Sequence, residues 1–296
     1  MEQKTNETRH LRLPDGRRLA YAEYGDPRGV PVIYCHGFPG SRLEAKLFES
    51  SMQHSGVRLI APDRNGLGES DPLPGRRLLD WPAEVAALAD ALGLERFHLL
   101  GVSGGGPYAL ACAHSLSERL IGVSLVCPLG PLNHPGLLRM MQWPAVFSFT
   151  AMRLMPLLTR PLYRHTLVPM AAHRPQWLYR LMLGMLPPPD YRVLASAQVR
   201  AVIIASLAES VRQGGAGVLR ELELYVAPWG FTPEEITKPV QLWHGSADKI
   251  VPELHGRTIA ERLPHCQARY VEGEGHFSLP IGHMERILEA LIERSP

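Results

Sequence analysis

The chain has 296 residues, of which 45% are hydrophobic and 20% charged, and its formal net charge is +2. This length suits one large α/β domain with an inserted segment and is too short for two full-sized enzyme domains. The small net charge gives no support for nucleic-acid binding. Residues 1–10 lack the apolar core of a signal peptide, and no stretch holds 18 uninterrupted apolar residues, so we expect a cytoplasmic protein without a membrane span.

The first group of expected elements is a series of strands separated by helices. Runs with strand character occupy residues 18–24, 30–35, 57–61, 97–102, 120–127, 239–243 and 267–271. Runs with helical character occupy residues 41–54, 81–92, 107–114, 254–263 and 284–293. We expect Asp80 to cap the helix 81–92 and Gly93 to end it. The alternation predicts a mainly parallel sheet with helices on both faces.

The segment from residue 128 to residue 236 breaks this alternation. It holds seven of the ten methionines and many prolines, including Pro187, Pro188 and Pro189, and it has helical rather than strand character. We therefore expect a helical cap inserted into the sheet domain and lying over the carboxyl ends of the strands, where ligands bind in such sheets. The predicted organisation is a core of residues 1–127 and 237–296 with a cap of residues 128–236.

The cysteines do not form a recognisable framework. Their positions, without any CxxC spacing, are Cys35, Cys112, Cys127 and Cys266. Two of them end strand-like runs. We expect reduced, buried thiols, with neither a disulfide framework nor a metal site.

A Gly-x-Ser-x-Gly pentapeptide at residues 101–105 joins the strand-like run 97–102 to the helical run that follows. This context is typical of a nucleophile elbow, in which Ser103 takes a strained backbone conformation with positive φ and presents its hydroxyl above the sheet. Gly101 and Gly105 would avoid collisions between strand and helix. The Gly104 N–H would then point to an oxyanion. The plainer alternative is a glycine-rich loop with a bystander serine.

An elbow serine needs a base and an acid, and in this arrangement the order along the chain is Ser, acid, His. Asp248 lies in a loop beyond the strand 239–243, and His276 lies in a glycine-flanked loop beyond the strand 267–271. Taken alone, Asp248 is equally well a turn residue, and His276 is one of 13 histidines. Glu274 is too close to His276 along the chain to orient its ring. We predict a Ser103–His276–Asp248 triad.

The second oxyanion donor should come from the loop after an earlier strand. Residues 36–40, His-Gly-Phe-Pro-Gly, directly follow the strand 30–35. Pro39 has no N–H, so the Phe38 N–H is the predicted partner of the Gly104 N–H. Taken alone, this segment is better explained as an ordinary Gly-Pro turn.

In this order, residues 36–40, 63–70, 101–105, 244–248 and 275–276 resemble the motifs of the α/β-hydrolase superfamily, specifically its capped, cofactor-free serine members. The resemblance covers residues 15–127 and 237–290. It implies an α/β-hydrolase fold with a mainly parallel eight-stranded sheet, a structural role for residues 63–70 and no cofactor. The elbow serine differs from the aspartate of haloalkane dehalogenases and epoxide hydrolases, so those activities are disfavoured.

The expected reaction is transfer of an acyl group from a carboxylic ester to water. His276 takes the Ser103 proton, Ser103 attacks the carbonyl, Asp248 fixes the imidazole, and water clears the acyl-enzyme. The same triad also suits C–C bond hydrolysis, cofactor-free lyase chemistry or perhydrolysis, and a hydrolase scaffold can serve as a small-molecule receptor.

The cap carries the only hint about the substrate. Residues 128–189 contain six arginines and no acidic residue. We expect Trp143, Phe147, Met152 and Met155 to line a pocket for an apolar acyl chain or an aromatic ester. The arginines would suit an anionic substrate or lipid surface. No single segment forms a clean amphipathic stripe, however, so the sequence favours no membrane contact. The sequence leaves open whether the protein forms a homodimer.

Overall fold

The computed structural model describes residues 7–134 and 136–293. Its centre is an eight-stranded sheet in the order β1-β2-β4-β3-β5-β6-β7-β8. The strands are β1 (Arg9–Arg12), β2 (Arg18–Gly25), β3 (Val30–Cys35), β4 (Val57–Pro62), β5 (Phe97–Val102), β6 (Leu120–Val126), β7 (Val240–Gly245) and β8 (Cys266–Val271). The β1–β2 and β2–β4 pairs are antiparallel and the remaining pairs are parallel. The expected mainly parallel, eight-stranded sheet is confirmed.

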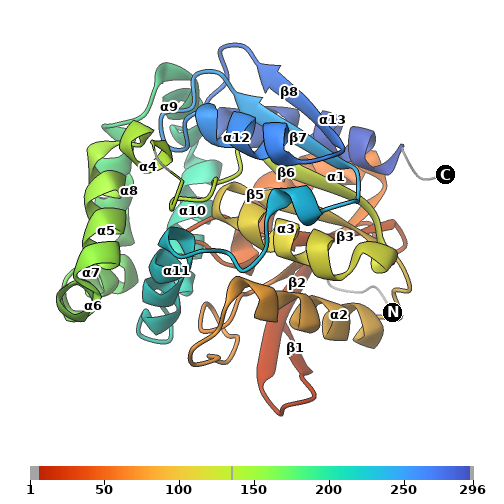
Figure 1. The fold of residues 1–296 in the computed structure, drawn as a ribbon, viewed down its shortest axis with the longest axis horizontal. Coiled ribbons are helices and arrows are strands. Elements are labelled where there is room, and N and C mark those ends of the chain that lie inside the picture. Colours follow the sequence, from red (N-terminus) through yellow and green to blue (C-terminus); the bar gives the residue numbers. More distant parts are fainter. Residues whose placement is uncertain (1–6, 135, 294–296) are drawn as a thin grey trace.

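Helices cover both faces of this sheet (Figure 1). On one face lie α1 (Glu49–Ser55) and α13 (Ser278–Ile292), and on the other lie α2 (Trp81–Ala91), α3 (Gly106–Ser115) and α12 (Leu254–Arg262). Alternate residues of β3 divide between the two cores, since Val32 and Tyr34 pack with α1 and α13 while Ile33 and Cys35 pack with α2 and α3. This period of two explains why central strands appear in the sequence as continuous apolar runs.

Three local details differ from the sequence-based expectation. Strand β1 was not expected, because its alternating exposed and half-buried residues lack an apolar run. The expected helix 41–54 is a 3₁₀ helix, Arg42–Phe48, followed by α1. Asp80 precedes α2 but does not cap it, because its carboxylate accepts hydrogen bonds from the backbone and side chain of Arg77. Gly93 follows α2 with a φ of +68°, as a helix-ending glycine should.

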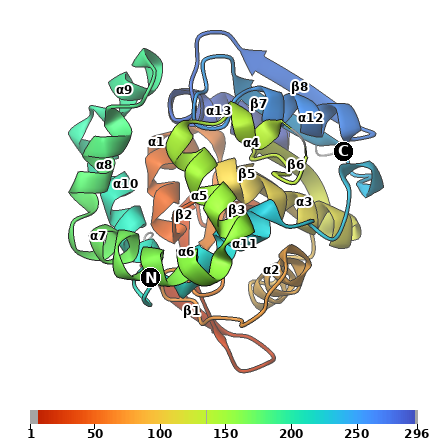
Figure 2. The same cartoon turned by 60° about the vertical axis from the view of Figure 1, so that its left-hand side comes forward.

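The segment between β6 and β7 is helical in its described part. Its helices are α4 (Leu137–Met140), α5 (Trp143–Leu154), α6 (Pro156–His165), α7 (Leu167–His173), α8 (Pro175–Leu183), α9 (Pro188–Leu194), α10 (Ala197–Ser210) and α11 (Ala216–Val226). Several of these helices begin at a proline, where the missing N–H and the fixed φ cost nothing. Helices α4 to α8 form a layer beside the sheet domain, at its strand carboxyl ends (Figures 1 and 2).

The inserted segment is anchored by its last two helices. On α10, the Ser206 hydroxyl accepts a hydrogen bond from the Ser41 N–H, and Glu209 pairs with the buried Arg42. On α11, Glu221 and Tyr225 are fully buried. The contacts of α10 hold the inserted segment to the loop that follows β3, and the burial of α11 fixes the end of the segment against the sheet domain.

Within residues 7–134 and 136–293, no single helix has the length and apolar character to cross a membrane. Helices α9 and α10 meet those criteria only when taken together, and a bend of 89° separates them.

Candidate active site

The strand-to-helix turn after β5 holds Ser103 in a left-handed conformation, with a φ of 54°. The packing around the turn explains its glycines. A Cβ placed on Gly105 would lie 2.0 Å from the carbonyl oxygen of Cys35, and one on Gly101 would lie 2.7 Å from the Cβ of Ala109. Neither approach is possible for a real side chain. The turn therefore has the expected geometry of an elbow, with the serine at its apex.

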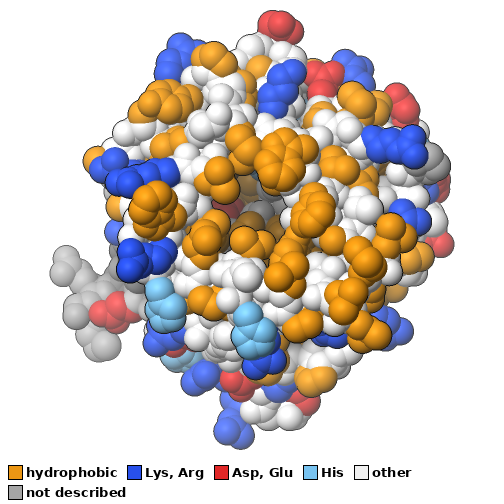
Figure 3. Space-filling model, turned by 90° about the vertical axis from the view of Figure 1, so that its left-hand side faces the viewer, with side chains coloured by type: hydrophobic (Ala, Val, Ile, Leu, Met, Phe, Trp, Pro, Cys, Tyr) orange, Lys and Arg blue, Asp and Glu red, His pale blue; other side chains and the backbone are white. Residues whose placement is uncertain are grey.

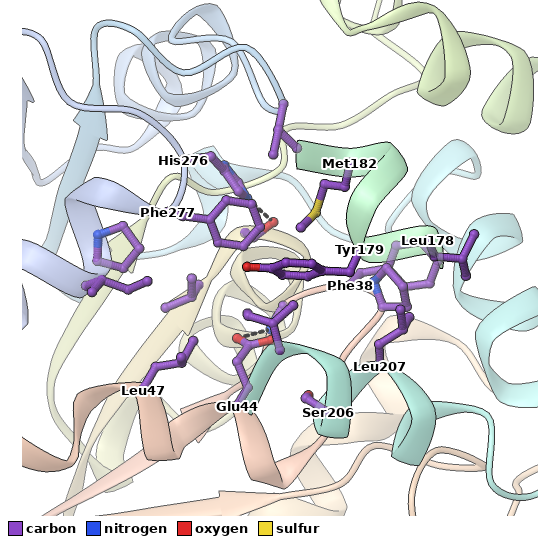
Figure 4. A pocket seen from close by; sticks show the side chains of 18 of the residues that line it. Phe38, Glu44, Leu47, Leu178, Tyr179, Met182, Ser206, Leu207, His276 and Phe277 are labelled. Atoms are coloured by element: carbon purple, nitrogen blue, oxygen red, sulfur yellow. Dashed lines mark hydrogen bonds between the residues drawn. The ribbon is translucent and has the colours of Figure 1, made fainter. Parts of the chain in front are cut away.

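Two distant loops bring an imidazole and a carboxylate to this serine. The Nε2 atom of His276 lies 2.9 Å from the Ser103 hydroxyl oxygen, and its Nδ1 atom lies 2.7 Å from Oδ2 of Asp248. The other carboxylate oxygen of Asp248 accepts the N–H groups of Ile250 and Val251, both at 2.9 Å. With its proton on Nδ1, His276 donates to Asp248 and can accept the hydroxyl proton of Ser103 at Nε2. Figure 4 marks this hydrogen bond by the dashed line that leaves His276.

Burial and charge act in opposite directions on this pair. Burial alone lowers the pKa of His276, but the charges of Asp248, Asp190 and Glu44 and the hydrogen bond to Asp248 outweigh it, so the pKa is raised above 6.5. Burial alone raises the pKa of Asp248, but His276 and the neighbouring His244 outweigh it and hold that pKa well below its usual value. Asp248 is therefore ionised and favours a positive imidazole beside it.

The two backbone segments that carry the predicted oxyanion donors approach each other closely. A Cβ built on Gly104 would lie 2.6 Å from the Cβ of Phe38 and 3.3 Å from its nitrogen. The backbone at residue 104 can approach Phe38 this closely because glycine has no side chain there. Both N–H groups thus belong to backbone segments that meet next to Ser103, which is the arrangement an oxyanion hole requires.

A buried ion pair is hydrogen-bonded to the backbone that precedes Phe38. The Arg64 guanidinium donates to both Glu221 oxygens, at 2.6 and 2.8 Å, and also to the carbonyls of His36 and Gly37. The Gly37 carbonyl is the other end of the peptide group whose N–H belongs to Phe38. A cation hydrogen-bonded to that carbonyl polarises the peptide and strengthens its N–H as a donor. Arg64 and Glu221 are both fully buried, so water does not screen this effect.

The same helix, α11, also contacts the Gly104 segment. The Tyr225 hydroxyl donates to the carbonyl of Gly104 at 2.9 Å and lies 3.3 Å from Glu221. The carbonyl of Ser103, in the peptide group that carries the Gly104 N–H, accepts from the N–H of Leu129 at 3.0 Å. One helix of the inserted segment therefore fixes both candidate donor loops.

Asp190, on α9 of the inserted segment, was missed by sequence reasoning. Its carboxylate accepts the backbone N–H groups of His276, Phe277 and Ser278 at 2.8 to 2.9 Å, and it is fully buried. It thereby anchors the loop of His276 and places a negative charge at the start of α13, where the helix dipole favours one. A signal was present in the sequence, because Asp190 is the first acid after the acid-free stretch 128–189.

Two cavities meet at Ser103. The first has a volume of about 400 Å³ and lies beside His276, Phe277, Tyr179 and Glu44 (Figure 4). The second, of about 330 Å³, extends between α5, α7 and α11. Both are lined by Phe38, Pro39, Ser103, Pro144, Ala145, Leu178, Leu207 and Ile250. The hydroxyl of Ser103 therefore stands at the junction of two largely apolar spaces.

Glu44 is the one carboxylate among the described residues that line either cavity. One of its oxygens accepts the Tyr34 hydroxyl and the Gly37 N–H, the latter at 2.8 Å. Burial raises its pKa, while these hydrogen bonds and the charges of Arg64 and His276 oppose the rise. Its side chain lies across the cavity from His276 and Phe277 in Figure 4. It makes the first cavity the more polar of the two.

The four cap residues expected to contact a substrate do not line either cavity. Trp143, Phe147 and Met155 are exposed and border an outer groove instead, and Met152 is buried in the hydrophobic core. The expectation is corrected because helix α5 turns Pro144 and Ala145 toward Ser103 and these bulkier residues away from it. Sequence spacing showed an apolar segment but not which side of it faces the sheet.

Cys127, at the end of β6, lies beside the triad. Its sulfur, one Asp248 oxygen and one His276 nitrogen lie within 4.8 Å of one another. Burial raises the pKa of the Cys127 thiol well above its usual value, and the nearby Asp248 raises it further. The Asp248 oxygen that faces His276 already accepts its N–H. The trio therefore fits a hydrogen-bonded Asp–His pair better than a metal centre.

A serine elbow beyond β5, an acid beyond β7 and a histidine beyond β8, all beneath inserted helices, define a protein of the α/β-hydrolase type. The chain belongs to the alpha/beta hydrolase fold family, whose profile matches residues 30–282. It is 29% identical over 271 residues to a non-heme chloroperoxidase of Streptomyces lividans, an alignment that covers 88% of this chain and 90% of the relative.

Solved structures share the fold. A thermophilic esterase from Thermogutta terrifontis superposes with a TM-score of 0.69 at 22% identity, covering 97% of each chain. A bromoperoxidase from Bacillus anthracis gives the same TM-score at 20% identity, covering 97% of this chain and 99% of the other. At such identities the likeness concerns the fold, and the activity has to be argued from the site.

Proposed function

We propose that this protein is a serine hydrolase that cleaves a carboxylic ester with an apolar acyl group through an acyl-enzyme on Ser103. The observation that carries the proposal is the continuous hydrogen-bonded chain from the Ser103 hydroxyl to His276 and on to Asp248, at 2.9 and 2.7 Å. This chain supplies a nucleophile, a base within reach of its proton, and a carboxylate that orients the base.

In the acylation step, His276 takes the proton of Ser103 as its oxygen attacks the ester carbonyl. The negative charge that forms on the carbonyl oxygen lies against the N–H groups of Phe38 and Gly104. The imidazolium is stabilised by Asp248 and returns its proton to the departing alcohol, so the ester C–O bond breaks and an acyl–serine bond remains. Water then attacks the acyl carbon with His276 again as base, which releases the acid and restores the hydroxyl of Ser103.

The two cavities that meet at Ser103 favour separate binding of the acyl and alcohol parts of the ester. The second cavity is largely apolar, and of its hydroxyl groups Tyr163 already donates to Ser148 at 3.0 Å. We assign it to the acyl chain. The first cavity, with Glu44 and Gln142 in its wall, is assigned to the alcohol part.

A fluorophosphonate probe and a series of p-nitrophenyl esters test this proposal. We expect the probe to label the peptide that carries Ser103, and Ser103→Ala to lose on the order of 10⁶ in kcat. Ser196→Ala, an exposed serine at the start of α10, should keep wild-type activity. Absence of labelling together with ester hydrolysis by Ser103→Ala would refute the mechanism, and absence of both labelling and turnover in the wild type would favour a small-molecule receptor.

The assignment of the cavities has its own test. Ala171 lines the second cavity only, and Ile281 lines the first only. We expect Ala171→Phe to shorten the longest accepted acyl chain and leave the alcohol preference unchanged, whereas Ile281→Phe should do the reverse. The same shift in both variants would contradict the division.

A second candidate is perhydrolysis, favoured by the similarity to a protein named non-heme chloroperoxidase. In this reaction hydrogen peroxide replaces water, so its oxygen forms the new bond to the acyl carbon and a peracid leaves. Measuring peracid and acid release from the same acyl-enzyme over a range of peroxide concentrations separates the two. Acid release alone would exclude the second candidate.

A further inference from the structure

The outer side of the inserted helices exposes a group of large apolar side chains. The cap face, as we call it, consists of Trp143 and Phe147 on α5, Leu157 and Leu158 on α6, and Trp177 and Leu181 on α8. Their exposed fractions run from 55% for Trp177 to 85% for Leu157. Figure 3 shows hydrophobic side chains gathered around a hollow on this side of the molecule. An apolar group of this size on a protein surface marks a contact with a partner or a membrane.

Residues 128–189, which carry the cap face, contribute arginines and no acidic side chain. Of the six arginines between residues 128 and 189, only Arg160 makes an ion pair within the described part of the chain, with Glu223 at 3.1 Å. The other five are exposed and have no acidic partner there, namely Arg139, Arg153, Arg164, Arg174 and Arg180. Lys and Arg side chains lie at the margins of the apolar ring in Figure 3. The surface therefore combines apolar side chains with unpaired positive charge.

The cap face lies on the same helices as the cavities above Ser103. Trp143 on α5 is followed by Pro144 and Ala145, which line both cavities, and Trp177 on α8 is followed by Leu178, which does the same. The inner sides of α5 and α8 therefore line the cavities, while their outer sides carry the cap face. A partner seated on the cap face would meet the protein where an apolar substrate enters.

We propose that the cap face docks on an anionic lipid surface, with Trp and Leu side chains in the headgroup region and the five arginines against lipid phosphates. Arginine guanidinium groups bind phosphate well, and tryptophan suits the boundary between water and hydrocarbon. The Arg180 guanidinium lies 5.6 Å from the Trp177 ring, so these two groups are placed to enter the interface together. A segment-by-segment search for a stripe misses this surface because it is assembled from three helices.

A second copy of the chain fits this surface less well. In a two-fold dimer each partner would present the same five unpaired arginines, and residues 128–189 offer no acid to oppose them. Like charges facing one another across an interface disfavour association. A lipid surface supplies the missing negative charge.

Vesicle sedimentation tests the proposal without depending on the catalytic mechanism when the Ser103→Ala protein is used. We expect binding to vesicles of phosphatidylcholine mixed with phosphatidylglycerol, weak binding to phosphatidylcholine alone, and loss of binding in high salt. Replacing Arg164 or Arg174 by glutamine should lower the partition coefficient about fivefold each. Leu157→Ser and Leu158→Ser should lower it about tenfold each.

Matched controls lie outside the cap face. Arg28→Gln, in the exposed turn between β2 and β3, and Leu254→Ser, exposed at the start of α12, should bind as the parent does. Circular dichroism of each variant checks that it is folded. Equal binding to both vesicle types, no binding to either, equal losses in the control variants, or a dimer in light scattering that Leu157→Ser dissociates would each overturn the proposal.

Discussion

The link between Asp190 and the histidine loop predicts a large effect from a small substitution, Asp190→Asn. The change keeps the shape of the side chain but removes its charge and replaces one acceptor oxygen with a donor group. In the native protein both oxygens are used, Oδ2 by the His276 N–H and Oδ1 by the N–H groups of Phe277 and Ser278. The asparagine oxygen can serve one side only, so at least one buried N–H loses its partner.

The magnitude follows from two contributions. An unsatisfied buried N–H costs about 1–3 kcal/mol, and loss of a negative charge at a helix N-terminus costs about 0.3–1 kcal/mol, rising to about 2 when partly buried. We therefore expect the free energy of unfolding to fall by about 2–4 kcal/mol, a large part of the 5–15 kcal/mol typical of domains. The charge of Asp190 also raises the pKa of His276, so its removal should shift that pKa downward.

Urea denaturation and the pH dependence of kcat/KM measure the two effects separately. The base must be neutral, so activity rises as His276 loses its proton, and in Asp190→Asn this rise should occur at lower pH than in the wild type. Asp71→Asn is the control, because its partly exposed carboxylate also accepts a backbone N–H, but from Arg18 and not from the histidine loop. An Asp190→Asn protein with wild-type stability and an unshifted profile would refute the reasoning.

Three further predictions follow from the site. In the wild type, kcat/KM should rise with pH around a midpoint above 6.5, because the folded protein raises the pKa of His276. Glu221→Gln should lower the free energy of unfolding by about 3–5 kcal/mol, since it leaves the buried Arg64 without its partner. Gly104→Ala should reduce kcat by about 10² to 10³, because the new methyl group would collide with Phe38 and displace an oxyanion donor.

Each of these has a contrary outcome. A flat profile from mildly acidic to mildly alkaline pH would exclude His276 as the base. Glu223→Gln, on the same helix but in a more exposed pair with Arg220, should cost about 0–1 kcal/mol, and a loss equal to that of Glu221→Gln would contradict the argument from burial. Gly282→Ala, where nothing lies within 4 Å of the new atom, should keep full activity, and an equal loss there would point to general damage.

The sheet and the elbow could be predicted because their signals are local. Buried parallel strands need continuous apolar runs, and the turn at Ser103 needs glycines where β3 and α3 approach it. Strand β1 was not predicted, because an edge strand with one half-buried face has no continuous apolar run. The placement of Asp248 and His276 beyond the ends of separate strands followed from parallel topology, which brings all carboxyl ends to one edge.

What the sequence by itself determined was therefore the order of strands and helices, the strained serine, and the loops that carry an acid and a histidine, since each depends on neighbours within a few residues. Only the tertiary structure decided which side of α5 faces Ser103, that Asp190 holds the histidine loop, and that Arg64 and Glu221 meet beneath Phe38. These pairs are joined by packing between segments far apart in the chain. The burial that makes such contacts strong arises only when the segments are assembled, and no local pattern of residues encodes it.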